Sequence, residues 1–169
     1  MGLGSVSNSN KNFLGMLGMH GTYEANLAMH NCDVMLNVGA RFDDRVTGAF
    51  APKSKKIHID IDKSSINKVV SVDFGIVGDC KQVLTALVQE VKKLQNQKIL
   101  RSKTAWWSQI NEWKNKDSLG FKQIGKNIKP QQAIKSLYNK TLNFDTYVTT
   151  EVGQHQMWAA QYFGFSKPN

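Results

Sequence analysis

The order of apolar and polar residues along the chain predicts three short strands. Residues 34–40, VMLNVGA, are almost continuously apolar, which is typical of a strand covered on both faces of a parallel sheet. Residues 56–62, KIHIDID, alternate between apolar and polar positions, and residues 76–79, IVGD, form a third short strand. The pattern therefore predicts an α/β fold with an open parallel sheet flanked by helices.

Helical spacing predicts the elements around these strands. Thr22 is the expected N-cap of a helix over residues 22–31, whose apolar face is formed by Ala25, Ala28, Met29 and Cys32. Asp79 is the expected cap of a longer helix, whose stripe comprises Val83, Leu84, Leu87, Val88, Val91 and Leu94. A further helix carries Trp106, Ile110 and Trp113 on one face.

A second domain is predicted to begin near Lys129. Pro130 suits the first turn of a helix, residues 146–153 suit a strand that runs into a turn, and another helix follows. We expect residues 1–94 to belong to a first α/β domain, residues 95–128 to connect it, and residues 129–169 to open a second α/β domain. Both domains have too few elements to close a core by themselves, so we expect both to be incomplete.

Composition narrows the class of protein without naming it. The 169 residues are 41% hydrophobic and 21% charged, which is ordinary for a globular chain. No apolar run approaches the roughly 20 residues of a membrane helix, and the first residues do not resemble a signal peptide. The two cysteines form no C-x-x-C pair, so a cytoplasmic location without disulfides or zinc is expected. The net charge of +9 is spread along the chain without a recognition motif, so we do not expect nucleic-acid binding.

The residues that could carry chemistry gather at glycines. Gly15, Gly18 and Gly21 precede the first helix, where backbone N–H groups favour phosphate, although a closely packed turn would use the same glycines. His20 within this segment could donate to a ligand oxygen or cap the turn. The four histidines show no metal-ligand spacing, so no metal site is expected.

The predicted strand ends point to a ligand site of their own. Gly39, Asp60 and Gly78 end the three strands, and open α/β sheets bind ligands at the carboxyl ends of their strands. Asp60 is placed to accept from a ribose hydroxyl, whereas Asp62 is expected rather to cap the turn at residues 63–65. The charged run at residues 41–45 follows the first strand, where it could serve a ligand or form salt bridges.

A second strand, turn and helix arrangement lies at EVGQHQMW. Gly153 would let a ligand approach the backbone, and Gln154 and His155 could hydrogen-bond a phosphate at the first helical turn. An ordinary helix start with a solvated histidine would have the same sequence.

Together, the segments GMLGMHGTYEANLA, VGARFDDRVTG, HIDID and VGQHQMWAAQ resemble the catalytic large subunits of the acetohydroxyacid (acetolactate) synthases, which are thiamine-diphosphate enzymes. The resemblance extends over nearly the whole chain and is weakest between residues 95 and 129. It implies that residues 1–94 correspond to the later part of a central FAD-binding domain. Residues 129–169 would begin the pyrophosphate-binding domain.

The resemblance also implies site residues. Those expected along FAD are Leu17, Gly18, Met19, His20, Gly21, Gly39, Ala40, Arg41, Asp43, Asp44, Arg45, Val46, Asp60, Ile61, Gly78 and Asp79. Those expected at thiamine diphosphate are Val152, Gly153, Gln154 and His155. In the family FAD has no net redox role.

The activity implied is decarboxylation of pyruvate and condensation with a second 2-keto acid, in branched-chain amino-acid biosynthesis. The complete enzymes also use Mg²⁺, form homodimers or homotetramers, and pair with a regulatory small subunit. Their catalytic glutamate lies in an earlier domain, and the chain has no matching G-D-G and N-N metal motif. We therefore expect no catalytic residue, no metal site and no synthase activity in the 169 residues alone. The alternatives are a flavin- or nucleotide-binding module without catalysis and part of a glyoxylate carboligase.

Overall fold

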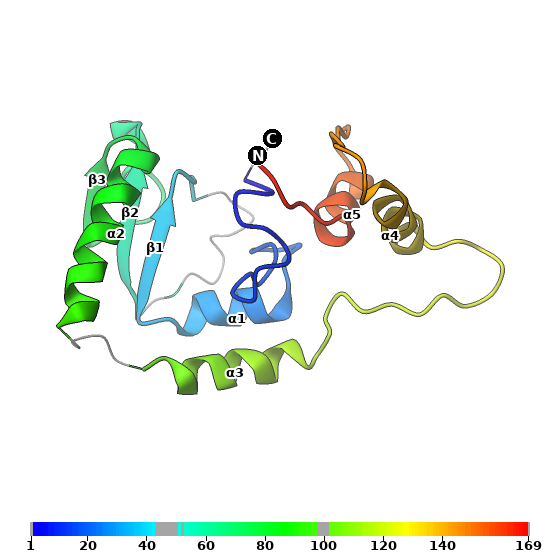
Figure 1. Cartoon of the computed structure of the whole chain (residues 1–169), viewed down its shortest axis with the longest axis horizontal. Helices are drawn as coiled ribbons and strands as arrows, with labels where there is room; N and C mark the ends of the chain where they lie inside the picture. The colour runs from blue at the N-terminus through cyan, green and yellow to red at the C-terminus, as the bar shows by residue number, and fades with distance from the viewer. Residues whose placement is uncertain (1, 43–50, 52, 98–101, 169) are drawn as a thin grey trace. The chain divides into compact units, whose positions relative to one another are not determined.

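The computed structural model describes residues 2–42, 51, 53–97 and 102–168 (Figure 1). The chain forms two compact units, one from Met1–Ala25 with Lys116–Asn169 and one from Asn26–Asn115. Helix α1, Tyr23–Asn31, begins in the first unit and continues into the second. The predicted domain boundaries at residues 94 and 129 stay a prediction.

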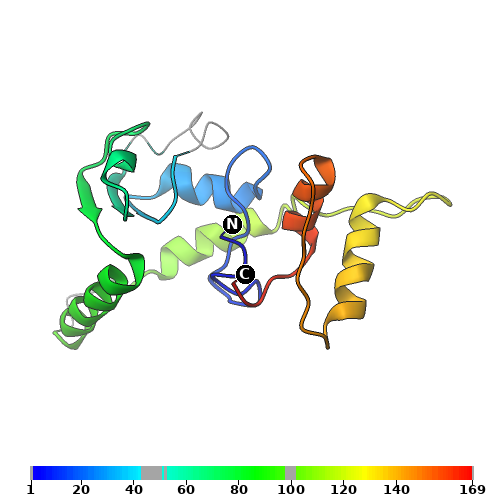
Figure 2. The same cartoon turned by 90° about the horizontal axis from the view of Figure 1, so that it is seen from above.

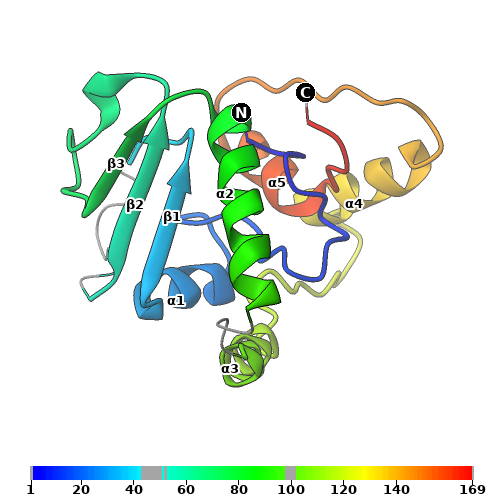
Figure 3. The same ribbon diagram turned by 60° about the vertical axis from the view of Figure 1, so that its left-hand side comes forward.

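The unit of residues 26–115 contains a three-stranded sheet (Figure 3). Its strands are β1, Val34–Val38, β2, Lys55–Asp60, and β3, Phe74–Val77, in the order β1-β2-β3. Both pairs are parallel, with Val34 opposite Lys55 and Ile57 opposite Phe74. The predicted α/β class with an open parallel sheet and flanking helices is confirmed.

The central strand supplies most of the sheet's buried surface. Ile59 and His58 in β2 are completely buried, and helix α2, Cys80–Asn96, packs against this strand. The prediction that β1 is covered on both faces is wrong for this chain, because Val34 is 53% and Leu36 is 41% exposed. All four residues of β3 are exposed as well. The elements described in this unit cover the middle strand. The two outer strands remain open, because no further described strand pairs with either of them.

Three predicted caps are confirmed. Thr22 Oγ1 accepts from the Ala25 N–H at 3.1 Å, and Asp79 Oδ1 accepts from the Gln82 N–H at 3.0 Å. Asp62 Oδ1 accepts from the Ser64 N–H at 2.8 Å and so begins the short 3-10 helix η2, Lys63–Ser65. Each oxygen satisfies an N–H that the first turn cannot pair, which is why these residues start the helices.

The predicted tryptophan helix is also confirmed. Helix α3, Thr104–Lys114, buries Ile110 at 2% exposure and packs Trp106 edge-on against Trp113, with 5.7 Å between ring centroids. In contrast, the long stripe of α2 remains partly open: Leu87, Val88, Val91 and Leu94 are 39–49% exposed.

The other unit is built around helices α4, Pro130–Thr141, and α5, Gln154–Tyr162, which pack together (Figure 2). The Tyr138 and Phe163 rings meet edge-on at 5.2 Å, and Phe163 is 8% exposed. Lys135 Nζ lies 4.9 Å from the Phe121 ring and 5.7 Å from the Tyr162 ring, a cation–π arrangement.

The strand predicted over residues 146–153 is wrong, since this segment has no regular secondary structure. A β-strand needs a partner for its N–H and C=O groups, and this unit has no strand among its described residues. The helix predicted after it is present as α5. None of the described helices is long and apolar enough to span a membrane.

Candidate functional site

The carboxyl edge of the sheet brings the predicted strand-end residues together. The Gly39 N–H donates to Ile59 O at 2.8 Å, and the Gly78 N–H donates to Asp60 O at 2.9 Å. Gly39 has φ +59, a backbone conformation that is unfavourable for residues other than glycine. These bonds join the ends of β1, β2 and β3 and fix the backbone there. The N–H groups of Gly39 and Gly78 therefore already donate within the sheet.

Asp60 is the partly buried acid of this edge. Its side chain is 13% exposed, and its Oδ1 accepts from the Asp62 N–H at 2.9 Å. His58 lies two residues earlier on the same strand and therefore on the same face. Its Nε2 is 3.7 Å from Asp60 Oδ2, and the Phe42 ring meets its imidazole edge-on at 5.2 Å.

The other acids near this edge have structural partners. Asp79 caps α2 and Asp62 caps η2, and the pKa of Asp62 is lowered by the Ser64 N–H and hydroxyl that it accepts from. Ile61, expected beside the adenosine, is 71% exposed and could cover a ligand only by its apolar side chain. Asp60 is the acid of this edge that caps no helix, and its Oδ2 accepts no hydrogen bond among the described residues.

The loop after β1 is described only in part. Ala40 and Arg41 are exposed, and the Asn37 side-chain amide donates to the Ala40 carbonyl, which holds the turn. Four residues predicted along FAD lie outside the described residues: Asp43, Asp44, Arg45 and Val46. Their predicted role stays a prediction.

The glycine segment before α1 belongs to the other compact unit, and its geometry favours close packing. A Cβ on Gly21 would lie 2.4 Å from Met16 O, and one on Gly15 would lie 2.7 Å from Thr22 Cγ2. Gly18, at φ +97, accepts from the Gly21 N–H at 2.9 Å. The glycines thus allow a tight turn around Thr22.

Other predicted residues of that segment point to its surface. Met19 is 74% and Leu17 is 36% exposed, whereas His20 is half-buried. The His20 carbonyl accepts from Gln161 Nε2 at 2.9 Å, which ties the turn to α5 within the same unit. A closely packed turn and a ligand-binding role are therefore compatible in this segment. The predicted FAD contacts of its residues stay predictions.

The start of α5 holds the residues predicted at thiamine diphosphate. Gly153 has φ +154 and ψ −170, a region open essentially to glycine alone, and it makes no side-chain cap. Val152 is 80% exposed, and Gln154 and His155 are exposed on the first turn. A Cβ on Gly153 would lie 3.1 Å from the His155 ring, so glycine keeps this helix start accessible.

Both cofactors of the resemblance fit the residues present. At the sheet edge, two glycines without side chains flank a carboxylate, which suits the ribose of a dinucleotide. At α5, an uncapped helix N-terminus after a glycine suits a pyrophosphate. No group of three His, Cys, Asp or Glu residues that could hold a metal ion occurs in the described part of the chain.

Two residues at the sheet edge, His58 and Cys80, were not among the predicted site residues. His58 is absent from the predicted site, although its spacing of two residues from Asp60 places both side chains on one face of the strand. Cys80 begins α2, and a Cβ on Gly39 would lie 3.1 Å from its Sγ. The approach of Gly39 to Cys80 depends on how the sheet places the end of β1 beside the start of α2, which spacing alone does not reveal.

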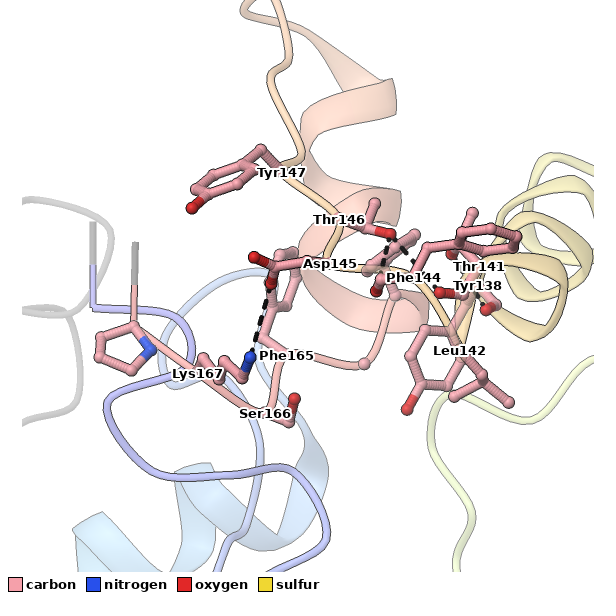
Figure 4. A pocket seen from close by; sticks show the side chains of 13 residues that line it. Tyr138, Thr141, Leu142, Phe144, Asp145, Thr146, Tyr147, Phe165, Ser166 and Lys167 are labelled. Atoms are coloured by element: carbon pink, nitrogen blue, oxygen red, sulfur yellow. Dashed lines mark hydrogen bonds and ion pairs between the residues drawn. The ribbon is translucent and has the colours of Figure 1, made fainter.

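A cavity of about 230 Å³ lies elsewhere, between the end of α4 and residues 144–147 and 163–168 (Figure 4). Its charged pair, Lys167 Nζ and Asp145 Oδ1, is 3.5 Å apart and largely exposed. None of the predicted site residues lines this cavity.

Comparison with known proteins adds the family. Residues 1–87 match the thiamine pyrophosphate enzyme central domain. Over 171 aligned residues the chain is 46% identical to the acetolactate synthase isozyme 3 large subunit of Escherichia coli. This alignment covers 99% of the chain and 30% of that protein. It is 48% identical to the acetolactate synthase large subunit of Haemophilus influenzae, with 99% and 30% covered. It is 42% identical to the chloroplastic acetolactate synthase of Arabidopsis thaliana, with 99% and 25% covered.

The chain thus spans about 30% of the length of its bacterial relatives, and the matched central domain contains the whole sheet edge described above. The open parallel sheet flanked by helices is consistent with this match. The chain belongs to the thiamine pyrophosphate enzymes, through their central domain.

Proposed function

We propose that this chain is part of an acetolactate synthase large subunit. The supporting observation is the sequence identity of 46–48% to bacterial subunits of that name, over 99% of the chain. The whole enzyme would decarboxylate pyruvate and join the product to a second 2-keto acid, in branched-chain amino-acid biosynthesis. Thiamine diphosphate supplies the decarboxylation and carbon–carbon bond chemistry when bound, and the protein positions and polarises it.

The residues of this chain have defined roles in the proposal. The first turn of α5, with Gln154 and His155, would bind the pyrophosphate of thiamine diphosphate. The sheet edge would bind FAD, with Asp60 accepting from ribose hydroxyls and Gly39 and Gly78 leaving room for the cofactor. Arg41 would face the FAD phosphates, because a guanidinium binds phosphate well.

The remaining parts of the proposal concern the whole protein. Mg²⁺ would accompany thiamine diphosphate, and the subunits would assemble as a homodimer or homotetramer with a regulatory small subunit in the cytoplasm. The predicted boundaries, residues 1–94, 95–128 and 129–169, are proposed as central domain, connection and start of the pyrophosphate-binding domain.

FAD titration of the purified 169-residue chain tests the binding role. We expect saturable quenching of flavin fluorescence, about 10-fold weaker after Asp60→Asn, because the amide removes the charge from the ribose acceptor. Arg41→Ala should weaken binding as well. Asp62→Asn is the matched control, since Asp62 is already occupied as a cap. Equal binding by all four proteins would contradict the assignment of the edge.

Acetolactate formation tests the catalytic part. The 169 residues alone should form none from pyruvate, thiamine diphosphate and Mg²⁺. Joined to the flanking sequences of the Escherichia coli relative, they should form it. Turnover by the 169 residues alone would contradict the proposed dependence on the other domains.

A further inference from the structure

His58 has unusual surroundings for a polar side chain. It is completely buried in the central strand, and neither Nδ1 nor Nε2 has a hydrogen-bond partner in the part of the chain that the structure describes. A neutral imidazole has one donor and one acceptor, and burying either without a partner is unfavourable. Such a group persists where a partner moves into place or where it serves a site.

Among the described residues, the site acid Asp60 is a candidate partner for His58. His58 Nε2 and Asp60 Oδ2 are 3.7 Å apart, beyond hydrogen-bond distance but only about 1 Å from it. A small rotation of the Asp60 carboxylate would close this gap. The imidazole has little room to move instead, because it is fully buried beside the Phe42 ring.

Resting on the proposed FAD site, we infer that His58 is a positioning residue for Asp60. With the ligand bound, His58 Nε2–H donates to Asp60 Oδ2 while the Asp62 N–H continues to donate to Oδ1. The two donors fix the rotation of the carboxylate from both sides. A carboxylate offers about four lone-pair positions, so two remain for the ribose hydroxyls.

Substitutions that move or remove the donor test this inference by FAD titration of the full chain. The amide nitrogen of glutamine lies near the position of Nε2, and that of asparagine lies near Nδ1. His58→Gln should therefore bind FAD within about 3-fold of the original chain, and His58→Asn should bind about 10-fold more weakly. Both replacements are polar amides, so a difference between them reports the donor position and not polarity or burial.

Coupling to Asp60 separates positioning from general support of the fold. In the Asp60→Asn background, His58→Asn should cause little further loss, because the two changes remove one interaction. Equal losses in both backgrounds, or equal binding by the Gln and Asn variants, would overturn the inference. ADP serves as a second ligand that contains the ribose but not the flavin, and the same ratios are expected with it.

A spectroscopic readout is available where both variants fold poorly. Imidazole ¹⁵N shifts of the original chain with FAD should show the proton on Nε2 and none on Nδ1. A proton on Nδ1 alone would overturn the inference. Absence of saturable FAD and ADP binding by the original chain would instead overturn the proposed site itself, and the positioning role with it.

Discussion

The carboxyl edge of the sheet and the segment before α5 have similar sequences but different structures. Each includes a short strand-like run that ends in a glycine, VMLNVG at residues 34–39 in one case and TYVTTEVG at residues 146–153 in the other. At the sheet edge, hydrogen bonds from Gly39 and Gly78 to the neighbouring strand fix the backbone. Residues 146–153 show no regular structure. Similar local sequences therefore give a rigid ligand edge only where neighbouring strands pair with them.

The largest expected effect on stability comes from removing a side chain from the core of the sheet. Ile59→Ala deletes a completely buried side chain next to Asp60, so we expect a loss of about 3 kcal/mol in the free energy of unfolding. Urea denaturation followed by circular dichroism measures it. Ile61→Ala is the control, because Ile61 is 71% exposed and should change stability by less than about 0.5 kcal/mol. Equal losses would mean that β2 is not the core of its unit.

The glycines of the edge offer a second test. Alanine at Gly39 or at Gly78 would place its Cβ 3.1 Å from a side-chain atom, but only Gly39 has positive φ. We expect Gly39→Ala to be more destabilising than Gly78→Ala by about 1–2 kcal/mol, the cost of the left-handed conformation. Urea titrations of the pair give the difference. Equal stabilities would show that the edge relaxes around Gly39.

Gly153→Ala applies the same kind of change to the unpaired segment. Its φ of +154 also favours glycine, yet backbone strain persists only where surrounding structure enforces it. Since no described strand pairs with residues 146–153, we expect a loss below about 0.5 kcal/mol. A thermal melt monitored by circular dichroism should detect little change. A loss as large as that of Gly39→Ala would mean that this segment is as firmly held as the sheet edge.

The smallest effect is expected at the amino end of the sheet. Asp73 accepts from Lys55 Nζ at 2.7 Å and from the Lys56 N–H at 2.9 Å, and these bonds lower the pKa of Asp73 below its usual 3.8. Because the folded pKa is depressed, the stabilisation is present above the unfolded value and is lost as pH falls through the folded value. Asp73→Asn should therefore lower the melting temperature near pH 6, and the difference should shrink below about pH 4.

The same pair raises the pKa of Lys55 above its usual 10.5, so Lys55 stays charged throughout that acidic range and the loss of stability follows the protonation of Asp73. Glu90→Gln, which removes the exposed partner of Lys93 on α2, is the control for a surface ion pair. A difference between Asp73→Asn and the original chain that stays constant from pH 6 to about 3 would contradict the role of the Asp73 carboxylate.

The sequence predicted most of what local chemistry decides. Thr22, Asp62 and Asp79 cap their helices, because an oxygen ahead of an unpaired first turn needs no distant partner. The three parallel strands followed from their apolar runs, and the resemblance led to the family that the central-domain match shows.

What the sequence did not predict depends on distant partners. The strand over residues 146–153 is absent because its apolar residues find no pairing strand. β1 is open because its two faces depend on neighbours that its own pattern cannot supply. The approach of His58 to Asp60 could have been found from their spacing of two residues, whereas the burial of His58 depends on Phe42, which lies 16 residues away in sequence.

The open outer strands have a consequence for the behaviour of the chain in solution. Phe74 and Ile76 on β3 are 62% and 39% exposed, and the outer side of this strand pairs with no described segment, so two copies could pair through their edges. The net charge of +9 opposes such contact through repulsion between copies. Salt screens that repulsion beyond about 10 Å at 0.1 M, whereas it does not weaken hydrophobic contacts. Colloidal stability of the chain should therefore decrease as ionic strength rises, a direction opposite to that of proteins held together by surface ion pairs.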